Sequence, residues 1–207
     1  MIKIRDILNM ISAVLFAWLY IPHIVLYALC REKRQIINED LSEYKKRIKI
    51  GLSNGFAFLY MLHHDRYFRV IFYHRAGPVF SLLFGWWRSG DRYFVISKTT
   101  KIGKGMFCPH PYSTIINAEA IGDNFVCHHL VTIGHKNDTT RLRPIIGDNV
   151  FVGVGASIIG KVKVGNNVVI GAGSVIVKDI PNNVVVAGNP AKVVKYLGNN
   201  MELLCGI

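Results

Sequence analysis

The sequence predicts a mainly β solenoid preceded by an α-helical, membrane-associated region. Three observations support this prediction: an uncharged apolar run near the start of the chain, an aromatic-rich stretch after it, and a six-residue repeat in the second half. The 207 residues are enough for one sizeable core with an accessory region. We expect four parts, in chain order an apolar helix, an aromatic-rich helical region, the solenoid and a tail: residues 1–30, 31–95, 96–194 and 195–207.

The chain is both apolar and basic. Hydrophobic residues make up 51% of it, and the formal net charge is +12. This balance indicates nucleic acid, an anionic membrane surface or an acidic substrate as partner. Residues 1–95 hold 14 Lys and Arg against 7 Asp and Glu, and residues 96–207 hold 11 against 6, with no polybasic tail. We therefore expect no nucleic-acid partner.

The first apolar run, "LNMISAVLFAWLYIPHIVLYAL" from Leu8 to Leu29, contains no Asp, Glu, Lys or Arg. A helix of roughly 20 apolar residues is long enough to cross a bilayer. A cleavable signal peptide is less favoured, because the run ends in "CREKR" and no small-residue cleavage site follows. Basic flanks on both sides, with Pro22 inside, permit either a single span or a kinked segment that re-enters one leaflet. A buried core helix is the alternative.

The next region joins a charged surface helix, "CREKRQIINEDLSEYKKRIKI", to "YFRVIFYHRAGPVFSLLFGWWRSGDRYF". Aromatic residues mixed with arginine are typical of protein surfaces at the lipid headgroup layer. The same aromatics would also serve to pack on one another, and the sequence leaves both interpretations open.

From Ile96 onward, an aliphatic residue or Cys recurs every six residues, often followed by Gly. Neither a helix nor an alternating strand has this period, whereas a solenoid with short flat segments and glycine-assisted corners does. The predicted inward residues are Ile96, Ile102, Cys108, Ile115, Ile121, Cys127, Ile133, Ile146, Val152, Ile158, Val164, Ile170 and Ile176.

The motifs "IGAGSVIVKDIP" and "GNPAKVV" make this half resemble the hexapeptide-repeat acyltransferases. The resemblance covers Ile96 to about Lys195 and implies a left-handed parallel β-helix. It also implies acetyl-CoA as co-substrate, no metal, and a homotrimer with acceptor sites between subunits. The four cysteines form no CxxC pair, which likewise offers no zinc site.

In such a coil, residues about 18 apart stack in adjacent turns. Cys108 and Cys127 should then fill the core, while His110 and His129, which are also 19 apart, should point outward one above the other. The segment "GHKNDTTRLRP" breaks the repeat as a polar loop at residues 134–144. Its place beside the histidine pair favours a functional role over a merely tolerated insertion.

Acyl transfer to a hydroxyl needs a base for the proton and donors for the oxyanion, and imidazole suits the first task near neutral pH. "CPHPYSTIINAEAIGDN" resembles the serine acetyltransferase segment that carries a catalytic histidine, which implies His110 as general base. Pro109 and Pro111 would stiffen its backbone for this task or for a structural one. His129 is a candidate second catalytic residue.

Two positions depart from the serine acetyltransferase pattern. Val95 stands where that pattern has Asp, and Arg143 stands where it has His. The resemblance implies that those residues orient the amino acid, so the sequence favours another hydroxyl acceptor, with His135 and Arg143 as candidate substrate-binding residues.

The resemblance also implies a coenzyme A site along a groove of the solenoid. The matching residues are Gly153, Gly155, Ala172, Lys178, Lys192 and Lys195. Lysines are natural point-charge partners for phosphate, although a solvated rim would contain lysines too.

The sequence thus predicts an acetyl-CoA-dependent O-acetyltransferase at the cytoplasmic side of a bacterial membrane. The expected acceptor is a small-molecule or lipid-linked glycan, such as a precursor of a capsular polysaccharide or exopolysaccharide. Serine O-acetylation and a non-catalytic membrane-bound scaffold are the alternatives.

Overall fold

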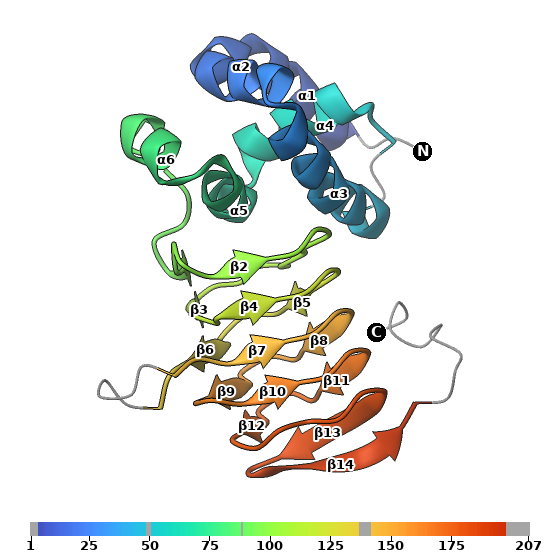
Figure 1. Cartoon of the computed structure of the whole chain (residues 1–207). Coiled ribbons are helices and arrows are strands. Elements are labelled where there is room, and N and C mark those ends of the chain that lie inside the picture. Colours follow the sequence, from blue (N-terminus) through green and yellow to red (C-terminus); the bar gives the residue numbers. More distant parts are fainter. Residues whose placement is uncertain (1–3, 49–50, 88, 137–141, 198–207) are drawn as a thin grey trace. The chain divides into compact units, whose positions relative to one another are not determined.

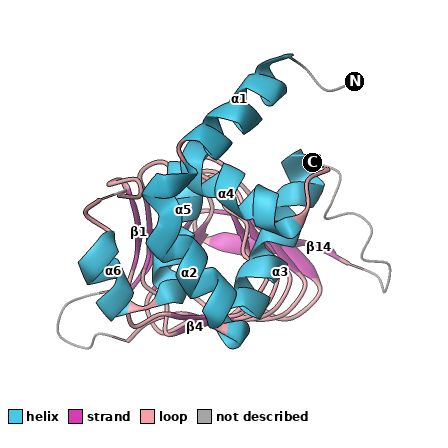
Figure 2. Ribbon diagram, turned by 90° about the horizontal axis from the view of Figure 1, so that it is seen from above, coloured by secondary structure: helices cyan, strands magenta, loops and turns pink. Residues whose placement is uncertain are grey.

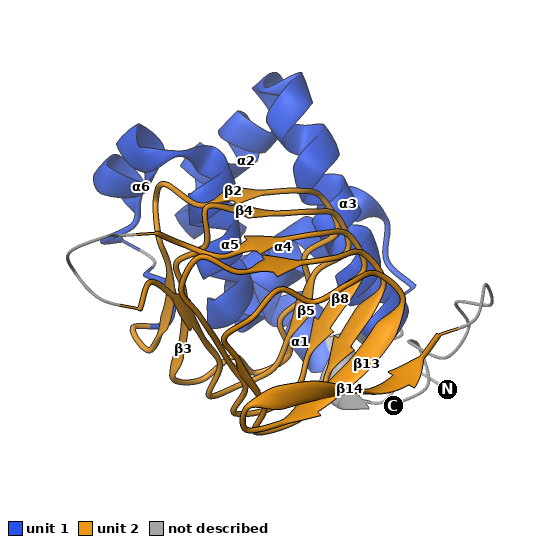
Figure 3. Ribbon diagram, turned by 60° about the horizontal axis from the view of Figure 1, so that its bottom comes forward, with its two compact units in different colours: residues 1–91 blue, residues 92–207 orange. Residues whose placement is uncertain are grey.

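The computed structural model describes residues 4–48, 51–87, 89–136 and 142–197. The chain divides into two compact units, Met1–Asp91 and Arg92–Ile207 (Figure 3). Unit 1 is helical and unit 2 is built of strands.

Unit 1 consists, in its described part, of α1 (Ile4–Leu15), the short 3-10 helix η1 (Ala17–Tyr20), α2 (Ile21–Leu29), α3 (Arg31–Ile48), α4 (Asn54–His64), α5 (Arg66–Ala76) and α6 (Pro78–Phe84) (Figure 2). Local sequence sets several of these boundaries. The Asp65 carboxylate accepts hydrogen bonds from the backbone N–H groups of Tyr67 and Phe68, at 2.8 and 3.0 Å, and so caps α5. Pro residues in the first turns of α2 and α6 suit helix starts, where no N–H donor is needed.

The core of unit 1 is aromatic. Phe58 packs on both Phe68 and Phe72, with ring centroids 6.5 and 5.4 Å away, and Tyr44 packs edge-on to Phe68. All four side chains are buried. Part of the aromatic-rich stretch therefore packs on itself, one of the two roles that the sequence left open.

A buried ion pair fastens α3 to α5. The Arg75 guanidinium donates from Nε and Nη2 to the two carboxylate oxygens of Asp40, at 2.9 and 3.1 Å. The two side chains are 6% and 1% exposed, so this bidentate pair is shielded from solvent.

Within the described residues, no single helix has both the length and the apolar composition to cross a bilayer. Leu8–Leu15 and Ala17–Leu29 meet that test only as a pair, and the chain bends by 62° between them.

Unit 2 is a parallel β-solenoid, which confirms the predicted fold class in its coarse form (Figure 1). The first sheet contains β1 (Phe94–Ile96), β3 (Thr114–Ile116), β6 (Thr132–Gly134), β9 (Ser157–Ile159) and β12 (Val175–Ile176). The second contains β2 (Lys101–Ile102), β4 (Ala120–Ile121), β7 (Ile145–Ile146) and β10 (Lys163–Val164). The third contains β5 (Val126–Cys127), β8 (Val150–Val152), β11 (Val168–Ile170), β13 (Val184–Gly188) and the antiparallel β14 (Ala191–Tyr196).

Three lines of turns join these sheets, and we name each by its residues. The histidine edge, between the third and first sheets, contains His110, His129, Gly155 and Gly173. The loop edge, between the first and second sheets, contains Asn117 and the described residues 134–136 and 142–144. The asparagine edge, between the second and third sheets, contains Asn124, Asn149, Asn167 and Asn183.

The core of the solenoid follows the six-residue period over most of its length. From Ile121 to Ile176 all the predicted inward residues are buried, as is Cys108, whereas Ile96 and Ile102 in the first coil are half-buried. Ile115, however, is 49% exposed, and its neighbour Ile116 is fully buried instead, so the prediction for Ile115 was wrong. The cause is a corner enlarged by two residues just before β3, as the strand pairing described next shows.

Candidate active site

The histidine edge is irregular at His110. Phe107 pairs with Val126 in the next coil, and Ile115 pairs with Thr132. The chain takes eight residue steps from Phe107 to Ile115 but only six from Val126 to Thr132. The corner that contains His110 is therefore two residues longer than the corner that contains His129. One coil further on, Val126 pairs with Phe151 and Thr132 pairs with Ser157, so the corner is regular again.

The two extra residues change the predicted stacking of the histidines. The backbone N–H of Leu130 donates to the carbonyl of Tyr112 at 2.9 Å, so Tyr112 is the regular neighbour of the His129 corner. His110 lies in the enlarged part. The expected register, with His110 directly paired to His129, is therefore wrong, although both belong to the same edge.

His110 has left-handed backbone, with a φ of 47°, which is uncommon for a residue other than Gly, although Asn, Asp and His adopt it more often than other residues do. The same corner contains a second such residue, Ser113, with a φ of 52°. Ser113 matches Leu130, Gly155 and Gly173, each of which is left-handed two residues before a strand of the first sheet. Ser113 thus occupies the regular left-handed position, and His110 is an additional one that the repeat does not require.

Several groups fix this corner around His110. Its carbonyl accepts the N–H of Tyr112 at 2.7 Å, and the Tyr112 ring lies 5.3 Å from that of Tyr93. Pro111 is buried, whereas the side chain of His110 is exposed. An imidazole held outward on a restrained turn is available to a substrate.

His129 is half-buried on the same edge, and its carbonyl accepts the N–H of Gly155 at 3.0 Å. His128 instead packs on Phe151, with ring centroids 5.2 Å apart. Of the two neighbouring histidines, His129 is the one without this packing role.

The loop edge gathers a polar cluster from three successive coils, which we call the loop cluster: Thr99, Asn117, His135 and Arg143. Arg143 Nη1 donates to Thr99 Oγ1 at 2.7 Å and to Asn117 Oδ1 at 3.3 Å. Asn117 Nδ2 lies 3.3 Å from His135 Nδ1. The structure thus brings together the two predicted substrate-binding residues, His135 and Arg143, around Asn117. Residues 137–141 of the loop lie outside the described residues.

Sequence reasoning missed Thr99 and Asn117. A signal existed, because Asn117 precedes His135 by 18 residues, one turn of the coil. An outward polar residue, however, looks like ordinary solvent-facing surface in a sequence.

Within one chain, His110 and the loop cluster lie at opposite ends of the strands of the first sheet. The strand β3 separates the His110 corner, which ends at Ser113, from Asn117. Within a single chain, the described ends of the loop, residues 134–136 and 142–144, therefore do not lie beside the histidine pair, contrary to expectation. A site that uses both edges could combine the histidine edge of one copy with the loop edge of another.

The predicted coenzyme A residues also divide into groups. Gly153, Gly155 and Ala172 lie on the histidine edge, where a Cβ on Gly153 would come within 2.7 Å of the Ala172 nitrogen. Gly153 is thus required by the close approach of two coils, whether or not a ligand binds.

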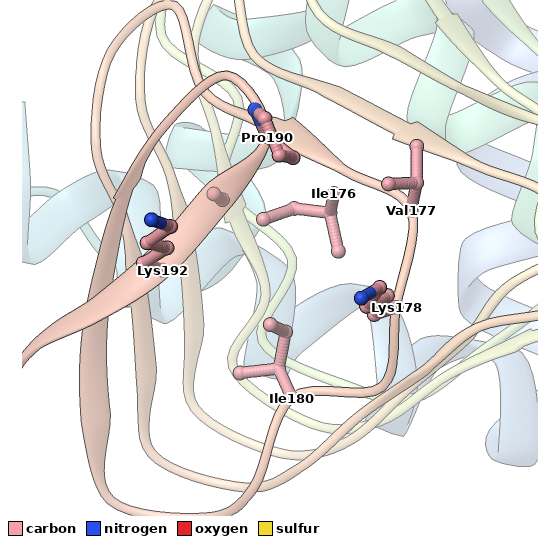
Figure 4. Close-up of a pocket in the computed structure, with 7 residues that line it drawn as sticks. Ile176, Val177, Lys178, Ile180, Pro190 and Lys192 are labelled. Carbon is pink, nitrogen blue, oxygen red and sulfur yellow. The ribbon is translucent and has the colours of Figure 1, made fainter.

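Lys178 and Lys192 line a pocket of about 180 Å³ at the last coil. Figure 4 shows them on either side of the apolar side chains of Ile176 and Ile180. Lys195 follows on β14, where it is exposed. Two cations flanking an apolar floor suit a ligand with an apolar part and phosphates. Among the described residues, no three His, Cys, Asp or Glu side chains form a group able to hold a metal ion.

Comparison with known proteins agrees with this architecture. Residues 143–178 match the bacterial transferase hexapeptide (six repeats) family, which confirms the six-residue repeat. The chain is 39% identical over 112 residues to a serine acetyltransferase of Buchnera aphidicola, an alignment that covers 53% of this chain and 43% of the relative. It is 38% identical over 113 residues to the Staphylococcus aureus serine acetyltransferase, covering 52% and 53%.

The fold is likewise similar to solved serine acetyltransferases. The structure of the Brucella abortus enzyme in complex with coenzyme A superposes with a TM-score of 0.68 at 27% identity, covering 84% of this chain and 71% of that one. The chain spans about half the length of the curated relatives named above. The names of these relatives do not support the sugar acceptor that the sequence favoured.

Proposed function

We propose that this protein is an acetyl-CoA-dependent O-acetyltransferase whose acceptor is L-serine and whose general base is His110. The observation that carries the proposal is the enlarged corner, which holds one outward histidine in left-handed backbone where the repeat needs none. Uncommon backbone of this kind costs roughly 1–3 kcal/mol and tends to persist where function uses it. The similarity to serine acetyltransferases, one of them bound to coenzyme A, supports the donor and the acceptor.

In the proposed reaction, the imidazole of His110 removes the proton from the serine hydroxyl as its oxygen attacks the thioester carbonyl. The tetrahedral intermediate then collapses, the C–S bond breaks, and the leaving coenzyme A sulfur receives the proton from the His110 imidazolium. The products are O-acetylserine and free coenzyme A thiol. Holding both substrates together supplies much of the remaining rate advantage.

We further infer that the site forms between two copies in a trimer. His110 and the loop cluster lie at opposite ends of one sheet, and cyclic symmetry would bring the histidine edge of one subunit to the loop edge of the next. In that arrangement, the guanidinium of Arg143 binds the serine carboxylate, a pairing suited to the planar fork of arginine. Lys178 and Lys192 bind coenzyme A phosphates.

The direct test is release of thiol from acetyl-CoA by the full chain with L-serine, comparing His110→Asn with the native protein. Asn tolerates left-handed backbone but is no base, so we expect a rate loss of about 10²–10⁴-fold with normal folding. His64→Asn, at an exposed histidine of unit 1, is the matched control and should keep its rate. An unchanged rate in His110→Asn would contradict the assignment.

The acceptor and the composite site have their own test. Arg143→Ala should raise the KM for L-serine by about 10- to 100-fold with a smaller effect on kcat, as expected for lost substrate binding. Mixing His110→Asn chains with Arg143→Ala chains before assembly should restore activity if each site uses two chains, and should restore none if one chain holds a whole site. Binding of acetyl-CoA without serine-dependent release would return attention to glycan acceptors, and failure to bind acetyl-CoA would favour a scaffold.

A further inference from the structure

The first helix of unit 1, α1, has a polar residue on its inner side and large apolar residues on its outer side. Ser12, which is half-buried, faces the interior, and its Oγ lies 2.9 Å from His63 Nε2. Ala13 is buried, but four larger apolar side chains of the same helix, Leu8, Ile11, Val14 and Leu15, are each at least half exposed. A helix of a water-soluble domain usually has the opposite pattern.

The same inversion continues in α2. His23 is completely buried, with its Nε2 2.7 Å from the Tyr73 hydroxyl and its ring 5.5 Å from that of Phe80. Ile21, Val25 and Leu29 on the same helix are largely exposed, although all are more apolar than the histidine that is buried.

The neighbouring helix α6 extends this surface. None of its residues is buried, although Phe80 links it to His23 of α2. Val79, Leu82 and Leu83 are each more than half exposed, and the exposed Trp86 and Trp87 follow. The indole N–H of Trp86 donates to the Leu83 carbonyl at 2.8 Å, so this ring can enter an apolar phase without an unpaired donor.

We propose that the outer faces of α1, η1, α2 and α6, with the two tryptophans after α6, form a surface that enters one leaflet of a lipid bilayer. An apolar surface of this extent marks a binding face, and tryptophan is typical of membrane interfaces. Helices suit this environment because they satisfy their own backbone hydrogen bonds. The inner faces of α1 and α2 are already packed on His63 and Tyr73, so lipid meets only one side of each helix.

Charge favours a bilayer over a second copy of the chain as the occupant. Residues 1–91 contain 13 Lys and Arg against 7 Asp and Glu, a net charge of +6. The exposed Arg31 comes two residues after the end of the run from Leu8 to Leu29, which itself contains no Asp, Glu, Lys or Arg. Basic groups beside an uncharged apolar face complement anionic headgroups, whereas two positively charged copies would repel each other.

This proposal is independent of the proposed function, since acetyl transfer and membrane binding can each fail alone. If both hold, the enzyme works at the cytoplasmic face of the membrane, the side on which acetyl-CoA is available. The sequence allowed Leu8–Leu29 either to span the bilayer or to re-enter one leaflet. Because only one side of these helices is buried in the protein, the second arrangement fits better.

The tryptophans provide a sharp test, because all three in the chain, Trp18, Trp86 and Trp87, are exposed on this surface. We expect the full chain to co-sediment with vesicles of phosphatidylcholine and phosphatidylglycerol. Its tryptophan emission should shift to the blue and be quenched by lipids brominated on their acyl chains. No co-sedimentation, or no quenching, would overturn the proposal.

The matched variants are Leu15→Glu/Leu82→Glu and Val194→Glu. The first places two charges in the surface and should weaken vesicle binding by more than about tenfold without changing thermal unfolding or thiol release. Val194, 61% exposed in unit 2, is the control and should leave binding unchanged. If sedimentation velocity instead shows a vesicle-independent oligomer that the double variant dissociates, a second copy covers this surface and the proposal is wrong.

Discussion

The histidine edge and the asparagine edge of the solenoid both require left-handed backbone but use different residues for it. Each turn on these two edges has a residue with positive φ two residues or fewer before a strand or bridge. The asparagine edge uses Gly105 in its first coil, at 74°, and Asn in the next four, at 54° to 58°, whereas the histidine edge uses Ser113, Leu130 and two glycines at 52° to 70°. Asn is the residue other than Gly that adopts this conformation most readily, so the residues of the asparagine edge suit their backbone better than Ser113 and Leu130 of the histidine edge do.

The side chains sharpen this contrast. On the asparagine edge, each Asn amide donates to the next coil, from Asn124 to Asn149 at 2.9 Å, then to Asn167 at 3.0 Å and to Asn183 at 2.8 Å. A second ladder runs beside it, with the N–H groups of Asp123 and Asp148 donating to the side chains one coil below. No described residue of the histidine edge forms a comparable run of side chains, and that edge has the extra left-handed His110. The comparison indicates that the asparagine edge stabilises the stacking of the coils, whereas the histidine edge is available to hold a catalytic residue.

Deleting His110 and Pro111 should have the largest effect. The deletion makes the corner match the regular corner from Cys127 to Thr132, so the coil should close without strain. We expect serine-dependent thiol release to fall to background, while the free energy of unfolding stays within about 1 kcal/mol of the native value or rises. Thiol release and urea unfolding of the same preparation measure both. Retained activity would show that the enlarged corner is not the catalytic feature.

The opposite outcome is expected on the asparagine edge. Asn149→Ala removes two inter-coil hydrogen bonds and places Ala in left-handed backbone, which should lower the free energy of unfolding by about 2–3 kcal/mol. Asn149→Gly removes the same bonds but accepts the backbone, so its loss should be smaller by about 1 kcal/mol. Urea unfolding compares the two. The rate of thiol release per folded molecule should be unchanged in both variants. A lower rate per folded molecule would show that the asparagine edge also contributes to catalysis.

The regular parts of the solenoid could be predicted from the sequence, because one inward residue per segment leaves a periodic mark. The failure at Ile115 has a physical cause. A period says which residues face inward but not how many residues a turn contains, and Pro109 and Pro111 indicate a turn without giving its length. His110 could be singled out by resemblance, but its displacement from the regular stack and the role of Asn117 depend on strand register.

The helical unit was harder to predict for a different reason. The apolar run from Leu8 to Leu29 is evident in the sequence, yet its inward side is fixed by Ser12 and His23, whose partners His63 and Tyr73 are 51 and 50 residues away. No local pattern reveals that the polar residues of these helices are the buried ones.

The smallest expected effect compares residues within the histidine edge itself. Leu130 has a φ of 60° and is 50% exposed, at a position where the following coils have Gly155 and Gly173. Leu130→Gly relieves about 1–2 kcal/mol of left-handed strain and loses about 0.5–1 kcal/mol through the greater freedom of the unfolded chain. We therefore expect the free energy of unfolding to rise by about 0.5 kcal/mol.

The reciprocal change, Gly155→Ala, should lower the free energy of unfolding by about 1 kcal/mol. A Cβ at this position meets no atom closer than 4.0 Å, so the cost comes only from the left-handed backbone. Urea unfolding resolves the two signs. If both variants are destabilised, the Leu130 side chain contributes packing that outweighs its backbone strain, and this edge is more ordered than the comparison implies.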